Sequence, residues 1–290
     1  MAFGRSAFFC GLGLLGGCAL ACTTAARAEP ENQGLPLWEF GLGVGALALN
    51  DYRGADTAHI YPLPIPYIVY RGQFLRADRD GLRGVFFNRN LVEINMSVNA
   101  TTPVESHNTR AREGMPDLKP TVEIGPSMDW HLWRSDERRV RLDLRMPLRT
   151  AMTVENSPHS IGWFFAPRLT VDFLDIGAHS GWNLGVLAGP LFASRRYNQY
   201  FYTVAPEYAR PDRPAYQAPG GFAGTEFLMS LSRRFPGYWV GAFVRYDTLS
   251  GAGFADSPLV RSDSFWAAGM GIAWMIGKSS KIVDAADALR

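Results

Sequence analysis

Apolar and charged side chains alternate along one ten-residue run, Val140-Arg141-Leu142-Asp143-Leu144-Arg145-Met146-Pro147-Leu148-Arg149. Successive side chains of an extended strand point to opposite faces, so this run has one apolar face and one charged face. Similar runs recur along the chain, and no long apolar segment follows the N-terminal region. A chain of such strands is typical of a β-barrel whose outer surface contacts lipid. The pattern therefore predicts an all-β, transmembrane antiparallel barrel.

The expected strands share a length of about ten residues and an alternation of apolar with polar or small residues. They cover residues 38–48, 59–70, 73–79, 82–88, 91–99, 122–132, 140–149, 161–174, 182–192, 222–233, 238–249 and 264–276. This makes about 12 strands, an even number, as bacterial barrels have. Long loops at 100–119, 156–160, 194–221 and 250–263 alternate with short turns. We expect the long loops outside the cell and the short turns in the periplasm.

Three prolines make the second expected strand unusual. Pro62, Pro64 and Pro66 share one face of the run from His59 to Tyr70. Proline has no backbone N–H and cannot donate to a neighbouring strand. This segment is therefore a poorly paired strand, a rim segment or a polyproline stretch.

The first 28 residues have the features of a signal peptide. Arg5 precedes an apolar run, and Ala26-Arg27-Ala28 is a small-residue cleavage site, so we expect the mature chain to begin at Glu29. The alternative is a lipobox, Leu15-Gly16-Gly17-Cys18, which would leave Cys18 as a lipidated N-terminus. All three cysteines lie in this leader. The mature barrel (29–277) would therefore be stabilised without disulfides.

Composition narrows the function classes. Loss of the leader removes two arginines and no acid, which lowers the formal net charge from +2 to zero. Nucleic-acid binding, which needs a concentrated basic face, is therefore not expected. The chain has 8 Trp, 11 Tyr and 18 Phe, residues that form the interfacial girdles of membrane barrels. An aromatic-rich soluble β protein is the alternative.

Charged residues gather on the inward faces of the central strands. A basic row is expected there, and acids on neighbouring strands face it. The row is Arg139, Arg141, Arg145, Arg149 and Arg168, and the acids are Glu123, Asp129, Asp143 and Asp172. These groups either bind anions or pair with one another, and a net charge of zero favours pairing. We therefore expect a lumen filled by ion pairs that conducts little.

The loop at 194–221 is rich in tyrosine. Its members are Tyr197, Tyr200, Tyr202, Tyr208 and Tyr216. Tyrosine is favoured at interfaces, so the loop is a candidate partner-binding site. The alternative is a cover that packs on itself over the barrel rim.

Catalytic chemistry has little support in the sequence. Asp129 and His131 share the inward face of one strand and are a possible base and its orienter, but no serine has a recognisable nucleophile setting. The five histidines lack metal-binding spacing. We therefore expect no enzyme activity, no metal and no cofactor.

A short tail, residues 278–290, follows the last expected strand. Ile282, Ala285, Ala286 and Leu289 could form one amphipathic turn of helix that tucks into the barrel mouth. The favoured interpretation is a frayed periplasmic tail, and the tucked helical turn is the alternative.

Several motifs, in their order and spacing, resemble the MipA/OmpV family of outer-membrane proteins. They are Asn50-Asp51-Tyr52-Arg53-Gly54, Tyr61-Pro62-Leu63-Pro64, Tyr70-Arg71-Gly72, Gly189-Pro190-Leu191-Phe192, Ala218-Pro219-Gly220-Gly221 and Asp256-Ser257-Pro258-Leu259-Val260. The resemblance implies a location in the outer membrane of a Gram-negative envelope, in contact with its lipid. It also implies a scaffold that links a lytic murein transglycosylase to a murein synthase. A small-solute channel and a surface adhesin are the alternatives. The shortness of the periplasmic turns counts against the scaffold.

Overall fold

The computed structural model describes residues 35–71, 75–78, 81–88, 91–137, 139–177 and 181–283. The expected leader, 1–28, and the end of the tail, 284–290, lie outside the described residues. No helix in these ranges is long and apolar enough to cross a membrane.

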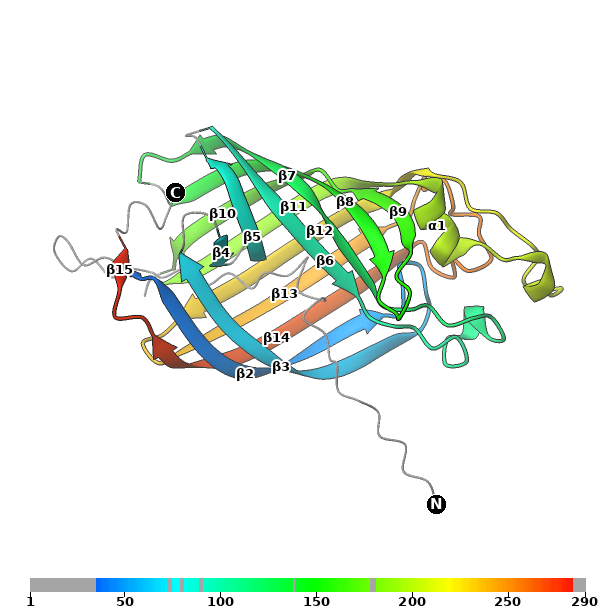
Figure 1. Ribbon diagram of the computed structural model, residues 1–290, viewed down its shortest axis with the longest axis horizontal. Helices are drawn as coiled ribbons and strands as arrows, with labels where there is room; N and C mark the ends of the chain where they lie inside the picture. The colour runs from blue at the N-terminus through cyan, green and yellow to red at the C-terminus, as the bar shows by residue number, and fades with distance from the viewer. Residues whose placement is uncertain are drawn as a thin grey trace, which may run out of the picture.

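Thirteen strands of the described chain form one antiparallel sheet that closes into a barrel (Figure 1). The first six are β2 (Trp38–Asn50), β3 (Ala58–Arg71), β4 (Leu75–Asp78), β5 (Gly81–Asn88), β6 (Val92–Thr101) and β7 (Thr121–Arg134). The others are β8 (Val140–Thr153), β9 (Ser160–Phe165), β10 (Arg168–Ile176), β11 (Trp182–Ala193), β12 (Gly221–Arg234), β13 (Tyr238–Thr248) and β14 (Ser264–Lys278). The barrel closes because β10 pairs with both β8 and β11. The predicted all-β barrel is confirmed.

One expected strand is divided in two. The segment 161–174 was predicted as a single strand, but it breaks at Ala166-Pro167 into β9 and β10. Proline lacks the N–H that would continue the ladder. Both pieces lie between β8 and β11, so the described strands occupy 12 positions around the barrel.

The two faces of the wall differ as the alternation predicted. On β8, Leu148 points outward and is 47% exposed, whereas Arg149 points into the lumen and is 4% exposed. The outward face carries exposed large apolar side chains on β2, β3, β6 to β12 and β14, and these include Trp38, Trp130, Trp163, Trp266 and Trp274. This is the apolar outer band that a barrel presents to lipid.

Small residues bring the first and last long strands close together. A Cβ atom on Gly43 of β2 would lie 2.1 Å from the Ile272 carbonyl oxygen of β14, and one on Gly41 would lie 2.2 Å from that of Trp274. Only glycine fits where two backbones approach so closely.

The two ends of the barrel are built differently. One end carries the long loops, with α1 (Arg195–Tyr202) and the short 3-10 turns η2 (Arg110–Arg112) and η3 (Pro206–Tyr208). The other end carries the short turns and a small antiparallel sheet of β1 (Leu35–Pro36) and β15 (Ile282–Val283) (Figure 1). The helical turn given as the alternative for the tail is therefore wrong at Ile282, because this residue pairs with Pro36. Its other members lie outside the described residues.

Candidate functional site

The clearest lumen ion pair joins neighbouring strands. Arg149 of β8 lies with its Nε 3.3 Å from Oε2 of Glu123 on β7, and both side chains are buried. Glu123 stands opposite Ala151 in the register, so Arg149 is its diagonal neighbour on the same face. The sequence placed both residues in the lumen, and the structure brings them together.

Polar neighbours bind the lumen acids Asp129 of β7 and Asp143 of β8 in two separate sets of contacts. Asp129 accepts hydrogen bonds from Ser127 Oγ at 2.7 Å and Asn95 Nδ2 at 3.0 Å. His131 Nδ1 lies 2.8 Å from Asp143 Oδ1 on the next strand. The suggested partnership of Asp129 with His131 is therefore replaced by a His131–Asp143 pair across β7 and β8.

The register also places two of the remaining arginines, Arg145 and Arg141, opposite acids. Arg145 of β8 is opposite Asp129 on one side and Arg168 on the other. Arg141 is opposite Asp172. Arg139 departs from the expected row: it lies in the exposed turn before β8, with its Nε 3.4 Å from Oε2 of Glu137.

Sequence reasoning missed a second lumen cluster, on β12 and β13. Glu226 and Asp247 stand directly opposite each other. Arg245 Nη2 lies 3.1 Å from Glu226 Oε2 and 2.6 Å from Asp247 Oδ2, and Arg53 Nε lies 3.6 Å from that same Asp247 oxygen. Two opposed carboxylates would repel each other, and the two arginines offset this. Inward-facing charges at Glu226, Arg245 and Asp247 were a signal in the alternation that could have revealed the cluster.

A third cluster, also missed, fixes the small sheet at the short-turn end. Glu39 forms ion pairs with Arg71, at 3.0 Å, and with Arg234. Arg71 Nη1 also donates a 2.7 Å hydrogen bond to the Pro36 carbonyl of β1. The first described residues are thus tied to the barrel wall.

The long loops at the other end form a cap with an apolar core. Ser194 accepts a hydrogen bond from the Tyr197 amide and begins α1. The Tyr202 ring stacks on Phe254 with centroids 3.8 Å apart and planes 12° apart. Tyr202 Oη donates a 3.0 Å hydrogen bond to the Arg53 carbonyl. Burial raises the pKa of Tyr202 to about 12.

Two arginines connect the cap loops to one another. Arg112 Nη1 donates to the Phe201 carbonyl at 3.1 Å. Arg213 Nη1 donates to the carbonyls of Ala111 at 3.1 Å and Glu113 at 2.9 Å. Because these arginines join carbonyls of loops far apart in sequence, the cap is a single packed unit.

The five tyrosines of the expected partner loop all pack in or against this cap core. Tyr202 is buried, and Tyr197, Tyr200, Tyr208 and Tyr216 are half-buried. Tyr197 Oη donates a 2.8 Å hydrogen bond to Glu123 in the lumen, and Tyr200 Oη donates to the Lys119 carbonyl at 3.1 Å. This placement favours the covering role over partner binding.

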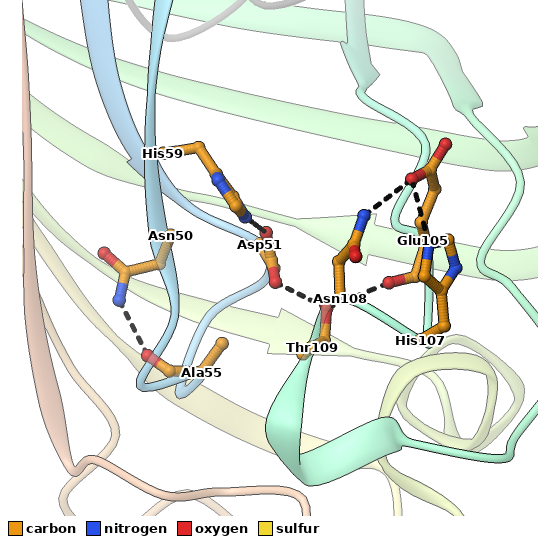
Figure 2. Close-up of polar contacts among 8 residues, drawn as sticks. All are labelled: Asn50, Asp51, Ala55, His59, Glu105, His107, Asn108 and Thr109. Atoms are coloured by element: carbon orange, nitrogen blue, oxygen red, sulfur yellow. Dashed lines mark hydrogen bonds and ion pairs between the residues drawn. The ribbon is translucent and has the colours of Figure 1, made fainter.

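Figure 2 shows how the turn between β2 and β3 attaches to the loop before η2. Asp51 accepts a 2.5 Å hydrogen bond from Thr109 Oγ1, and its other oxygen lies 3.1 Å from His59 Nε2. Asn50 Nδ2 donates to the Ala55 carbonyl at 2.7 Å and closes the turn. Within the described ranges, no group of three or more His, Cys, Asp or Glu residues could hold a metal ion.

A closed antiparallel barrel with an apolar outer band, long loops at one end and short turns at the other is an outer-membrane β-barrel. The chain belongs to the MipA family: the family model described as "MltA-interacting protein MipA" matches residues 42–276. It is 24% identical over 211 residues to the outer membrane protein OmpV of Vibrio cholerae serotype O1, covering 71% of this chain and 75% of OmpV. The protein is therefore an outer-membrane protein.

Two solved structures are similar only distantly. A bacterial polysaccharide outer membrane secretin aligns with a TM-score of 0.40 and 9% identity, over 82% of this chain and 99% of the secretin chain. LpxR from Salmonella typhimurium aligns with a TM-score of 0.31 and 8% identity, over 81% of this chain and 100% of its own. Likenesses this distant say nothing about function.

Proposed function

We propose that this protein is a non-catalytic outer-membrane anchor that docks murein-remodelling enzymes at its periplasmic end. The family description names an interaction with MltA. We propose that the docking surface is the small sheet of β1 and β15. Among the described strands, none pairs with the outer edge of β15, to which an extended segment of a partner could add. Arg71 and Glu39 fix β1 to the barrel, so this surface is rigid. The partners we propose are a lytic murein transglycosylase and a murein synthase.

The lumen and the cap support an anchor more than a channel. Ion pairs and hydrogen bonds on β6 to β8 and on β12 and β13 compensate the lumen charges. The cap core packs across the long loops of the opposite end. A channel would need an open and uncompensated path, so we expect low conductance in planar bilayers.

Crosslinking in intact cell envelopes, followed by affinity purification of the tagged full chain, tests this function. We expect a murein transglycosylase or synthase to be recovered with the full chain. A chain ending at Ser280, which lacks β15, should insert into the membrane and lose that partner. Tyr208→Ala, at the opposite end, is the matched control and should keep it. Recovery of no murein enzyme, or equal recovery without β15, would remove the docking role proposed for this sheet.

A further inference from the structure

Three cationic side chains at the long-loop end have no counter-charge within the described chain. Lys119 lies just before β7, and Arg195 and Arg196 are the first two residues of α1. All three side chains are exposed. Within the described ranges, none of them forms a hydrogen bond or an ion pair through its side chain. We call these three residues the rim cations.

Two exposed arginines farther out on the same loops show the contrast. Arg110 Nη1 lies 3.5 Å from Asp56 Oδ2, and Arg210 Nη1 lies 4.0 Å from Glu113 Oε2. These pairs join neighbouring loops of the cap and balance charge within the chain. The rim cations differ from these two arginines in having no such partner.

One tyrosine brings Lys119 next to α1. The Tyr200 hydroxyl accepts a 2.8 Å hydrogen bond from the Lys119 amide and donates one of 3.1 Å to the Lys119 carbonyl. Arg196 precedes Tyr200 by four residues, so both lie on the same side of the helix. Arg196 Cβ lies 3.4 Å from the position that a Cβ atom on Gly162 of β9 would occupy. The rim cations therefore share one sector of the barrel rim, at the ends of β7, β8 and β9, where α1 lies (Figure 1).

This sector lies just beyond the apolar outer band. Trp163 of β9 and Val154 after β8 are exposed. Ser194, the residue before α1, donates its amide to the Trp163 carbonyl at 3.0 Å and accepts from the Trp163 amide at 3.0 Å. The Val154 amide donates to the carbonyl of Pro120, directly before β7. Tryptophan is enriched where lipid chains meet headgroups, so the rim cations lie at the level of the headgroups.

Two acids of the adjoining loops have other partners. Glu155 Oε1 lies 2.9 Å from His159 Nδ1 and accepts a 2.7 Å hydrogen bond from Thr153 Oγ1. Asp117 Oδ1 accepts a 2.8 Å hydrogen bond from the Ser106 amide. Three like charges in one sector repel one another, so an anion from outside the chain would stabilise them.

We propose that the rim cations bind the phosphate groups of a glycolipid in the outer leaflet of the membrane. Arginine donates to phosphate oxygens in a bidentate geometry, and lysine adds a compact positive charge. The acyl chains of the same lipid lie against the apolar outer band, next to Trp163, which a soluble anion would not use. The site is at the opposite end from the sheet of β1 and β15 and does not depend on the docking role.

Native mass spectrometry of the full chain in phosphatidylcholine nanodiscs tests the proposal. The nanodiscs are titrated with lipid A that carries both of its phosphates, or with the same lipid after the phosphates are removed. The bound fraction at each lipid concentration gives Kd. We expect the phosphorylated lipid to bind at least about tenfold more tightly. Equal binding of the two lipids would overturn the proposal, because it would leave the phosphates without a role.

A triple variant, Lys119→Gln, Arg195→Gln and Arg196→Gln, tests the residues. One cation near an anionic lipid surface contributes about fivefold in affinity, so loss of all three should weaken lipid A binding about a hundredfold. Arg195→Lys with Arg196→Lys keeps the charge and should bind more tightly than the triple variant. If the triple variant does not fold, Arg195→Gln alone replaces it, with an expected loss of about fivefold. Unchanged binding in the glutamine variant would overturn the proposal.

The matched control removes three exposed positive charges elsewhere. Arg110→Gln, Arg139→Gln and Arg210→Gln together change the net charge by the same amount, and each of these arginines is paired with an acid. We expect this variant to bind lipid A as the unchanged protein does. Equal weakening in the two triple variants would mean that net charge alone governs binding, and would overturn the assignment to the rim cations.

Competition with inorganic phosphate distinguishes a lipid headgroup from a free anion. We expect a large excess of inorganic phosphate to leave lipid A bound, because the free ion has no acyl chains to place on the outer band. Displacement of lipid A at the same ionic strength as a chloride control would mean that the rim cations take a soluble anion, and would overturn the assignment to a lipid.

Discussion

Tyr197 of α1 donates a 2.8 Å hydrogen bond from its hydroxyl to Oε1 of Glu123 in the barrel lumen. The other oxygen of Glu123 accepts from Asn99 at 3.1 Å and lies 3.3 Å from Arg149. One buried carboxylate thus joins the cap to three strands of the wall. The cap and the charged lumen are therefore coupled parts of one structure.

Glu123→Gln should destabilise the barrel strongly. The substitution leaves the buried Arg149 charge without its counter-charge, and breaking such a pair costs about 3–5 kcal/mol in free energy of unfolding. Urea titration of the protein in lipid vesicles measures this. Glu105→Gln is the control: Glu105 is exposed and lies 3.8 Å from His107, so the change should be under about 1 kcal/mol. Equal stability of the two variants would contradict the importance of the lumen pair.

Tyr202→Ala should loosen the cap without opening the barrel wall. The substitution removes the stacking on Phe254 and the hydrogen bond to the Arg53 carbonyl. Truncation of a buried aromatic costs about 3–5 kcal/mol. We expect rapid proteolytic cleavage within the loop 203–220 and intact strands on electrophoresis. Tyr208→Ala, at a half-buried position, is the control, and cleavage at the same rate in both variants would argue against a Tyr202-centred core.

The cap should weaken at alkaline pH. Burial raises the pKa of Tyr202 to about 12, whereas an unfolded tyrosine has a pKa of about 10. The folded state holds the proton more tightly, so the stabilisation is complete below pH 10. About 3 kcal/mol is lost as the pH rises from about 10 towards 12. Proteolysis of the cap loops at pH 8 and pH 11 measures this.

Tyr202→Phe is the matched variant for the pH series. It removes the titrating hydroxyl and keeps the ring against Phe254. The protection of its cap loops against proteolysis should fall less at high pH than in the unchanged protein. Some dependence should persist, because burial also raises the pKa of Tyr52, whose hydroxyl donates to the Leu259 carbonyl. If proteolysis of the cap loops increased with pH as much in Tyr202→Phe as in the unchanged protein, Tyr202 would be excluded as the controlling group.

The strand pattern was predictable because lipid on one side imposes a strict alternation. Val140 to Arg149 lies wholly within β8, and its inward residues are those that the alternation predicted. The break at Ala166-Pro167 was missed because Leu169, Val171 and Phe173 continue an apolar pattern past the proline. Hydrophobic periodicity indicates which face of a strand is apolar, but it does not indicate where the hydrogen-bond ladder is interrupted.

The lumen partners were only partly predictable. The pairing of Arg149 with Glu123 follows from neighbouring strands and their inward faces. Arg53 reaches Asp247 from a loop nearly two hundred residues away in sequence, and no local pattern encodes that contact. The cap was also hidden, since α1 is short and its tyrosines were compatible with either a cover or a binding surface.

Gly43→Ala should impair barrel closure. The new Cβ would stand 2.1 Å from the Ile272 carbonyl oxygen, so β2 and β14 would have to separate. Overpacking of this kind costs about 1–3 kcal/mol, here at the contact between the first and last long strands. Gly237→Ala is the control, because nothing lies within 4 Å of its Cβ position. The fraction folded in vesicles, measured by the heat-dependent shift in electrophoretic mobility, should fall for Gly43→Ala alone. An equal folded fraction for Gly43→Ala and Gly237→Ala would mean that β2 and β14 can separate at no cost in free energy, and would contradict the importance of their close backbone approach.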